Sequence, residues 1–312
     1  MADARVTVVL NADDRFSRPL AATIRSIISQ LSPGRLLDMY VCDMGITPAN
    51  RVKIESVAQQ DQVNFQWISS LAEKTAHLPA DMTHISTAAY GRLFIPQVLP
   101  AGTEKVLYLD CDLIARRCIG ELFDTPIGDF AAMGVADAGS PFVSSIYGVP
   151  FWPRYGRKAD DVNFNSGVLL LNLPVLREID FTGAAISYLT DGRHRFLQDQ
   201  EAINGVLAGR IGHVDPRWNQ QTEIFEERFA ATLPYSEEEM RGLFKDPWIV
   251  HFTTPAKAWN YESTHPFREE WFRNLDETPY RGWRPKRSQY LAGRAGQVMR
   301  RGRGFLASLR AG

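Results

Sequence analysis

The stretch KVLYLDCDLI, from Lys105 to Ile114, places two carboxylates directly after an apolar run. The run Val106–Leu109 predicts a strand that is buried on both faces of a sheet. In extended backbone, residues two apart point to the same side, so Asp110 and Asp112 would converge. Two such charges repel each other unless a cation lies between them. The pattern therefore predicts either a site for Mn2+ or Mg2+, or two solvated carboxylates that begin a turn.

Strands and helices alternate on both sides of this stretch. Apolar runs predict strands at 5–10, 36–43, 63–69, 105–112, 129–137, 166–173 and 248–252, and helical spacing predicts helices at 19–31, 50–60, 86–99 and 199–209. Continuous apolar strands separated by helices are typical of a mostly parallel sheet covered on both faces. The predicted fold class is therefore α/β, with a mostly parallel central sheet flanked by helices. No internal repeat or linker precedes Pro279, which predicts one domain, residues 1–278, and a C-terminal tail, residues 279–312.

Composition limits the cellular setting. The chain has 312 residues, of which 45% are hydrophobic and 23% charged, as in a globular protein with a large core. It contains no run of eighteen apolar residues, and its first apolar run is too short for a secretory signal. The three cysteines are widely spaced and predict neither a disulfide framework nor a metal knuckle. We therefore expect a cytoplasmic protein.

Polar residues follow several of the predicted strands. They include Asn11 to Asp14, the Asp110–Asp112 pair, Asp137 and His251. In parallel sheets, ligands bind beyond the carboxyl ends of the strands, so these side chains should meet at one edge. No glycine-rich phosphate loop is present, so another group must neutralise the phosphates of any bound nucleotide.

A phosphatase of the haloacid dehalogenase type is an alternative, because its strand also ends in Asp-x-Asp. There the first aspartate is the nucleophile and the second is the acid and base. That chemistry also needs a later lysine and an aspartate pair at a strand end. Lys158 and Asp160–Asp161 are present, but they do not follow a predicted strand.

Five segments occur in the order seen in glycosyltransferase family 8: HISTAAYGRLFIPQVLP…KVLYLDCDLI, FNSGVLLLNL, LQDQEAIN, DPRWNQ and VHFTTPAKAWN. The chain resembles this family from Val6 to Asn260, and most of all its bacterial lipopolysaccharide galactosyltransferases. The resemblance implies the GT-A fold, a UDP-sugar donor and Mn2+ or Mg2+. It also implies transfer of a hexose, galactose or glucose, with retention of anomeric configuration. The acceptor would be a saccharide or glycolipid in cell-envelope polysaccharide synthesis.

The resemblance also implies roles for individual residues. The metal ligands are Asp110, Asp112 and His251, and Asp110 also lies at the donor site. The other donor-binding residues are Asp13 for uracil, Arg15 near the ribose, Lys257 for the diphosphate, and Arg92, Asp137 and Asn165 for the sugar. The catalytic positions are Asp199 and Gln200. Taken singly, several of these residues also have a purely structural explanation, such as a helix N-cap for Asp199.

Retention allows two routes. A covalent intermediate needs a nucleophile on the far face of the sugar, but Gln200 is an amide and the resemblance makes Asp199 a sugar contact. The residues therefore favour attack on the face that UDP leaves. A non-catalytic sugar-nucleotide binder would lose the metal pair or His251, and both are present. A nucleotidyltransferase would carry a glycine-rich basic signature near its N-terminus, which NADDRFSRPL does not provide.

The tail is strongly basic. Nine lysines or arginines lie between Arg281 and Arg310, no acidic residue follows Glu277, and aromatic residues are interleaved. Nucleic-acid binding is disfavoured because the chain has no nucleic-acid-binding motif. A solvated tail and a segment bound to an anionic membrane surface both stay open. The second predicts a peripheral protein at the inner face of the cytoplasmic membrane.

Overall fold

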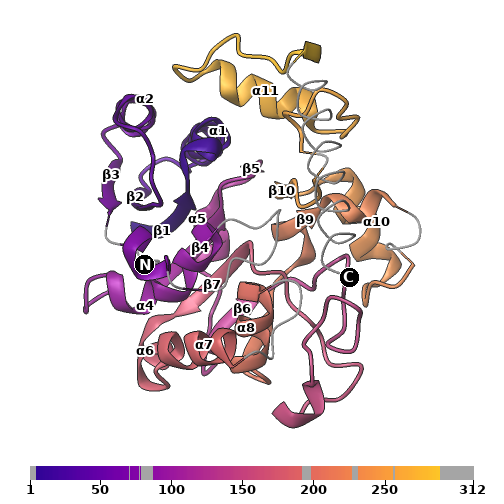
Figure 1. Cartoon of the computed structure of the whole chain (residues 1–312). Coiled ribbons are helices and arrows are strands. Elements are labelled where there is room, and N and C mark those ends of the chain that lie inside the picture. The colour runs from indigo at the N-terminus through magenta and orange to yellow at the C-terminus, as the bar shows by residue number, and fades with distance from the viewer. Residues whose placement is uncertain are drawn as a thin grey trace, which may run out of the picture.

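The computed structural model describes residues 5–69, 71–76, 78, 87–191, 198–226, 231–255 and 257–288 (Figure 1). Its centre is a seven-stranded sheet. In spatial order the strands are β3 (Val63–Ile68), β2 (Leu36–Asp43), β1 (Arg5–Ala12), β4 (Lys105–Asp110), β7 (Val168–Asn172), β6 (Ala132–Gly134) and β8 (Ile211–His213). Only β7 runs antiparallel to its neighbours β4 and β6, so the sheet is mostly parallel, as predicted.

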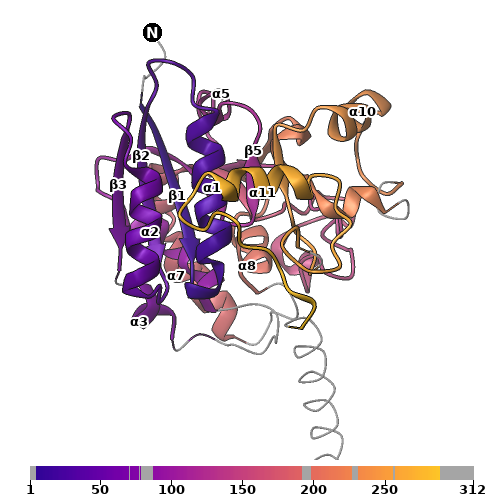
Figure 2. The ribbon, with the colours of Figure 1, turned by 90° about the horizontal axis from the view of Figure 1, so that it is seen from above.

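Helices cover both faces of this sheet (Figures 1 and 2). One face packs against α1 (Ser17–Ser29) and α2 (Pro48–Ala58), and α11 (Arg268–Asp276) packs against α1. The other packs against α4 (Ile95–Val98), α6 (Leu173–Glu178), α7 (Phe181–Thr190) and α8 (Gln198–Val206). The remaining α-helices are α3 (Leu71–Thr75), α5 (Ile119–Phe123) and α10 (Glu237–Lys245), and the 3-10 helices are η1 (Asp14–Phe16), η2 (Thr87–Phe94), η3 (Trp152–Tyr155), η4 (Pro216–Asn219) and η5 (Thr222–Phe225).

Side chains of β1 alternate between the two cores. Val8 and Leu10 pack with residues of α1, whereas Val9 packs on the opposite side, and all three are fully buried. Since both faces of the strand are covered, both sets of positions must be apolar. This is why the strands of the sequence read as continuous apolar runs.

The chain leaves the large sheet at the Asp-x-Asp pair. β4 ends at Asp110, the backbone bends at Cys111 and Asp112, and β5 (Leu113–Ala115) joins a second sheet. That sheet is completed by β10 (Ile249–His251) and β9 (Gln220–Gln221). The prediction of one strand over 105–112 is therefore wrong at its end. Leu113 pairs with His251 instead of continuing along β7, so the two carboxylates meet across a bend.

The predicted helix over 86–99 is also different in the structure. Its described part is η2, a 3-10 helix, followed by the single turn α4. Gly91 lies against the side chain of Asn11, and Pro96 lies in the first turn of α4. Both residues disfavour a continuous α-helix.

The first residues of the tail pack on the domain. Tyr280 is buried, and its hydroxyl donates a hydrogen bond to Asn50 Oδ1 at 2.8 Å. The Arg18 guanidinium lies 4.7 Å from the ring centre of Trp283. Residues 289–312, the larger part of the tail, lie outside the described residues, so its membrane role stays a prediction. None of the described helices has the length and apolar character needed to cross a membrane.

Candidate active site

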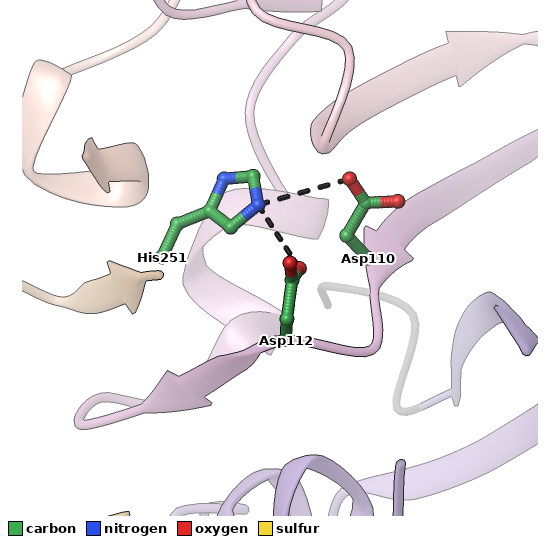
Figure 3. Close-up of side chains that lie close together, drawn as sticks. All are labelled: Asp110, Asp112 and His251. Atoms are coloured by element: carbon green, nitrogen blue, oxygen red, sulfur yellow. Dashed lines mark hydrogen bonds and ion pairs between the residues drawn. The ribbon is translucent and has the colours of Figure 1, made fainter. Parts of the chain in front are cut away.

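Three predicted metal ligands lie together where β4 and β10 end (Figure 3). His251 Nε2 is 3.1 Å from Asp112 Oδ1 and 3.7 Å from Asp110 Oδ2. One ligand atom from each residue lies within 4.8 Å of the other two. Two carboxylates and an imidazole are a donor set that suits Mn2+, so the side chains present fit a divalent metal.

Asn219, in η4, holds the imidazole of His251. Its Oδ1 lies 2.9 Å from His251 Nδ1, and its Nδ2 donates to Asn165 Oδ1 at 2.9 Å. Because the amide turns its oxygen toward the ring, Nδ1 donates this hydrogen bond, and Nε2 faces the carboxylates. A metal-ligating histidine is commonly oriented in this way, by a hydrogen bond from its other ring nitrogen.

Each carboxylate is held through one oxygen and turns the other toward His251. Asp110 Oδ1 accepts from Tyr108 Oη at 2.5 Å and from Arg92 at 2.9 Å, and its Oδ2 faces the imidazole. Asp112 Oδ2 lies 2.7 Å from Lys257 Nζ, and its Oδ1 faces the imidazole. Burial alone would raise the pKa of Asp112, but Lys257 and His251 outweigh it and lower that pKa. A carboxylate must be deprotonated to bind a metal, and this lowered pKa favours that form of Asp112.

Arg92 links this cluster to Asp199. Its Nε lies 3.1 Å from Asp199 Oδ2, and its Nη1 donates to the Ser166 carbonyl at 2.9 Å. Burial raises the pKa of Asp199 to about 6, although Arg92 opposes the shift and Asp110 adds to it. The guanidinium therefore bridges the metal cluster and the candidate sugar pocket.

Asp137, Asn165 and Gln200 form that second cluster, and all three are buried. Asp137 Oδ2 accepts from Asn165 Nδ2 at 3.0 Å and from Gln200 Nε2 at 3.1 Å. Gln200 Oε1 accepts from the Ser166 amide at 3.0 Å. Burial raises the pKa of Asp137. Since Asn219 contacts both Asn165 and His251, the two clusters form one hydrogen-bonded network.

Asp13 and Arg15 pair with each other. Asp13 caps η1 by accepting from the amides of Arg15 at 3.0 Å and Phe16 at 3.3 Å. Its Oδ2 accepts from the Arg15 guanidinium at 2.9 Å. The pairing of β1 with β4 matches Asn11 with Asp110, so Asp13 follows at the same edge of the sheet. Asp13 thus caps a helical turn, while its base-reading role stays a prediction.

Several residues that shape this site were not predicted. Asn219 and Tyr108 orient the metal ligands, and Gly167 leaves space for them. Asn219 belongs to the quoted segment DPRWNQ, but nothing in its local sequence marks it as a partner of His251. Only the fold brings residues 219 and 251 together.

Comparisons with known proteins identify the family of this chain. The model of the family described as glycosyl transferase family 8 matches residues 7–263. General stress protein A of Bacillus subtilis is 27% identical, over 89% of this chain and 96% of its own. Lipopolysaccharide 1,3-galactosyltransferase of Salmonella typhimurium is 21% identical, over 88% of this chain and 79% of its own.

Two solved structures have the same fold. The bifunctional glycosyltransferase WbbM has a TM-score of 0.77 at 22% identity, covering 89% of this chain and 51% of that protein. The galactosyltransferase LgtC has a TM-score of 0.73 at 24% identity, covering 88% of this chain and 96% of that protein. The fold of this chain is the GT-A fold.

Proposed function

Because this chain belongs to glycosyl transferase family 8, we propose that it is a metal-dependent, retaining hexosyltransferase. The donor is a UDP-sugar carrying galactose or glucose, and the acceptor is a saccharide or glycolipid of the cell envelope. The observation that carries the proposal is the convergence of Asp110, Asp112 and His251 beside the buried Asp137 cluster. The two clusters adjoin through Asn219, as a charged leaving group and its sugar would require.

Asp110, Asp112 and His251 would hold Mn2+ or Mg2+ beside the donor diphosphate. When bound, the metal supplies positive charge that stabilises the departing diphosphate. Lys257 lies 2.7 Å from Asp112 and adds a second positive charge on the same side. Arg92, paired with Asp110 and Asp199, supplies positive charge beside both carboxylates.

Asp137, Asn165 and Gln200 hold the sugar. Arg92 contacts the sugar from the side of the metal cluster. Asp199 is engaged by Arg92, and Gln200 uses both ends of its amide, so neither is an available nucleophile. The acceptor hydroxyl therefore attacks C1 on the face that UDP leaves. The bond from C1 to the phosphate oxygen breaks, the new C1–O bond forms, and the hydroxyl proton passes to a phosphate oxygen. Gln200 stabilises the positive charge that develops on the sugar ring.

Asp13 reads the N–H of uracil, with Arg15 beside the ribose. Arg15 donates to the oxygen of Asp13 that the base would use, so the guanidinium shifts when UDP binds. The exposed position of Arg15 leaves room for that movement.

The basic tail holds the enzyme at the inner face of the cytoplasmic membrane, where a glycolipid acceptor is accessible. The charge of the sequence supports this part of the proposal.

The haloacid-dehalogenase alternative needs Asp110 as a nucleophile. That carboxylate is instead held by Tyr108 and Arg92. The non-catalytic alternative predicts that UDP-sugars bind without turnover. A measurement of released UDP therefore distinguishes it from an enzyme.

The test is to incubate the protein with UDP-galactose or UDP-glucose, with and without Mn2+, and to measure released UDP. We expect slow, metal-dependent hydrolysis that His251→Ala removes. UDP binding without release would support a non-catalytic binder. Pyrophosphate release from UTP and a sugar phosphate would support a nucleotidyltransferase, and metal-dependent hydrolysis of a simple phosphate monoester would support the phosphatase.

A further inference from the structure

Glu223 is a carboxylate beside the site that the reaction above does not use. It lies in η5, and its side chain is partly buried. Thr253 Oγ1 donates a short hydrogen bond to Glu223 Oε2 and accepts one from the Thr222 amide at 3.1 Å. Glu223 makes no ion pair with any cation of the described residues. The hydrogen bond from Thr253 thus fixes the direction of the Glu223 carboxylate, and no cation of the described residues pairs with it.

Gln221 sets the position of this segment relative to Asp137. Its Nε2 donates to the Ala136 carbonyl at 2.8 Å, and its Oε1 accepts from the Ala138 amide at 2.8 Å. The amide therefore binds the backbone on both sides of Asp137. Glu223 follows two residues later, so the Asp137 and Glu223 carboxylates are held in a defined relationship.

Gly139 lies beside both carboxylates. A β-carbon at Gly139 would lie 3.5 Å from Asp137 Oδ1 and 3.8 Å from Glu223 Oε1. These are ordinary contact distances, and the backbone of Gly139 is not in the left-handed region. Alanine would therefore fit without strain and would place a methyl group against both carboxylates.

We propose that Glu223 accepts a hydrogen bond from a hydroxyl of the saccharide acceptor and so helps to select that acceptor. The inference rests on the function proposed above. Carboxylate oxygens accept hydrogen bonds, so the adjacent Glu223 and Asp137 suit a ligand rich in hydroxyl donors.

The place of Glu223 favours the acceptor over the donor sugar. Through Thr253 it is bound to the segment that carries His251 and Lys257, which lies on the diphosphate side of the sugar pocket. An acceptor that attacks on the face UDP leaves must approach from that side. Glu223 is therefore placed to contact the acceptor, while Asp137 contacts the donor sugar.

The test compares Glu223→Ala, Glu223→Gln and Gly139→Ala with the unaltered protein. The donor is the UDP-hexose that the protein hydrolyses, and the acceptors are methyl glycosides of galactose, glucose and N-acetylglucosamine. We expect Glu223→Ala to raise the acceptor KM by about tenfold to a hundredfold, as for loss of one charge-assisted hydrogen bond. The KM for the UDP-hexose should stay the same. Glu223→Gln should have a smaller effect, and Gly139→Ala should raise the acceptor KM by placing a methyl group against Glu223. Glu226→Ala, an exposed carboxylate on the same segment, is the matched control and should change neither KM.

Three results would overturn the inference. An unchanged acceptor KM in both Glu223→Ala and Gly139→Ala would contradict it while leaving donor hydrolysis, and so the proposed function, intact. An equal rise in both KM values would show a structural role for Glu223. Failure of the unaltered protein to use any of these acceptors would also count against it. Absence of UDP-hexose hydrolysis would instead overturn the proposed function itself.

Discussion

Gly167 lies directly against His251. A β-carbon at Gly167 would be 2.2 Å from His251 Cε1 and 2.7 Å from Asp110 Oδ2, distances that a real side chain cannot adopt. The Gly167 carbonyl also accepts a hydrogen bond from the Asp110 amide at 2.8 Å. The missing side chain is therefore what allows the imidazole and the carboxylate to approach each other.

Gly167→Ala should remove metal-dependent activity. The added methyl group forces His251 or Asp110 out of place, and a displacement of about 1 Å at a reacting centre can lower the rate about a hundredfold. The measurement is Mn2+ dependence of UDP-hexose hydrolysis, together with Mn2+ affinity in the presence of UDP. Gly102→Ala is the matched control, because nothing lies within 4 Å of its β-carbon position. Normal Mn2+ affinity in Gly167→Ala would show that the cluster does not bind the metal.

Gln200→Ala should separate the two retaining routes. If Gln200 stabilises charge on the sugar, its loss lowers kcat by about a hundredfold to a thousandfold but leaves the anomeric configuration of the product retained. The measurement is kcat with product anomers assigned by NMR spectroscopy.

Added azide tests the same variant further. In the front-face route no group on the far face has been removed, so azide should not restore turnover. Complete loss of turnover, restored by azide with an inverted glycosyl azide as product, would establish a covalent route and refute our proposal.

The sequence predicts this fold well where burial alone decides the structure. β1, β2 and β7 are covered on both faces, so their apolar runs identify them directly. The sequence predicts the fold less well where the chain leaves one sheet and pairs with a strand of another. The bend after Asp110 depends on the pairing of Leu113 with His251, which are distant in sequence.

Site residues also differ in how well the sequence predicts them. Asp110 and Asp112 stand out because carboxylates after an apolar run are conspicuous. Asn219 and Gly167 have no local signal, since their importance comes from His251, which the fold brings beside them. The packing of Tyr280 and Trp283 was missed for a related reason: the basic character of the tail conceals two aromatic contacts with the domain.

His265 should make stability depend on pH. Burial lowers the pKa of His265 to about 4, and its ring packs against Phe225 and Phe252. The folded protein thus keeps this imidazole neutral, whereas the unfolded chain protonates it below a pH of about 6.5. The unfolded state then binds more protons, so this contribution to stability is complete above about pH 6.5 and is lost as the pH falls toward 4.

The measurement is urea unfolding of the unaltered protein and of His265→Phe at about pH 7 and about pH 5. His265→Phe should lose less stability between these conditions, by about 1 kcal/mol after allowance for partial solvent access. An equal loss of stability in both proteins would mean that protonation of His265 does not destabilise the folded protein.

Removal of the residues after Ser288 should release the protein from anionic membranes. The cut keeps Tyr280 and Trp283, which pack on the domain, and it removes the last five arginines: Arg294, Arg300, Arg301, Arg303 and Arg310. Each basic residue near an anionic surface contributes about 1 kcal/mol of binding, so their joint loss should abolish sedimentation with phosphatidylglycerol vesicles. UDP-hexose hydrolysis should be retained, since the cut leaves the metal cluster and the sugar pocket intact. Vesicles of phosphatidylcholine alone are the control, and binding of the full chain should weaken as salt is added. Equal sedimentation of the shortened and full chains with anionic vesicles at low salt would exclude the tail as the membrane anchor.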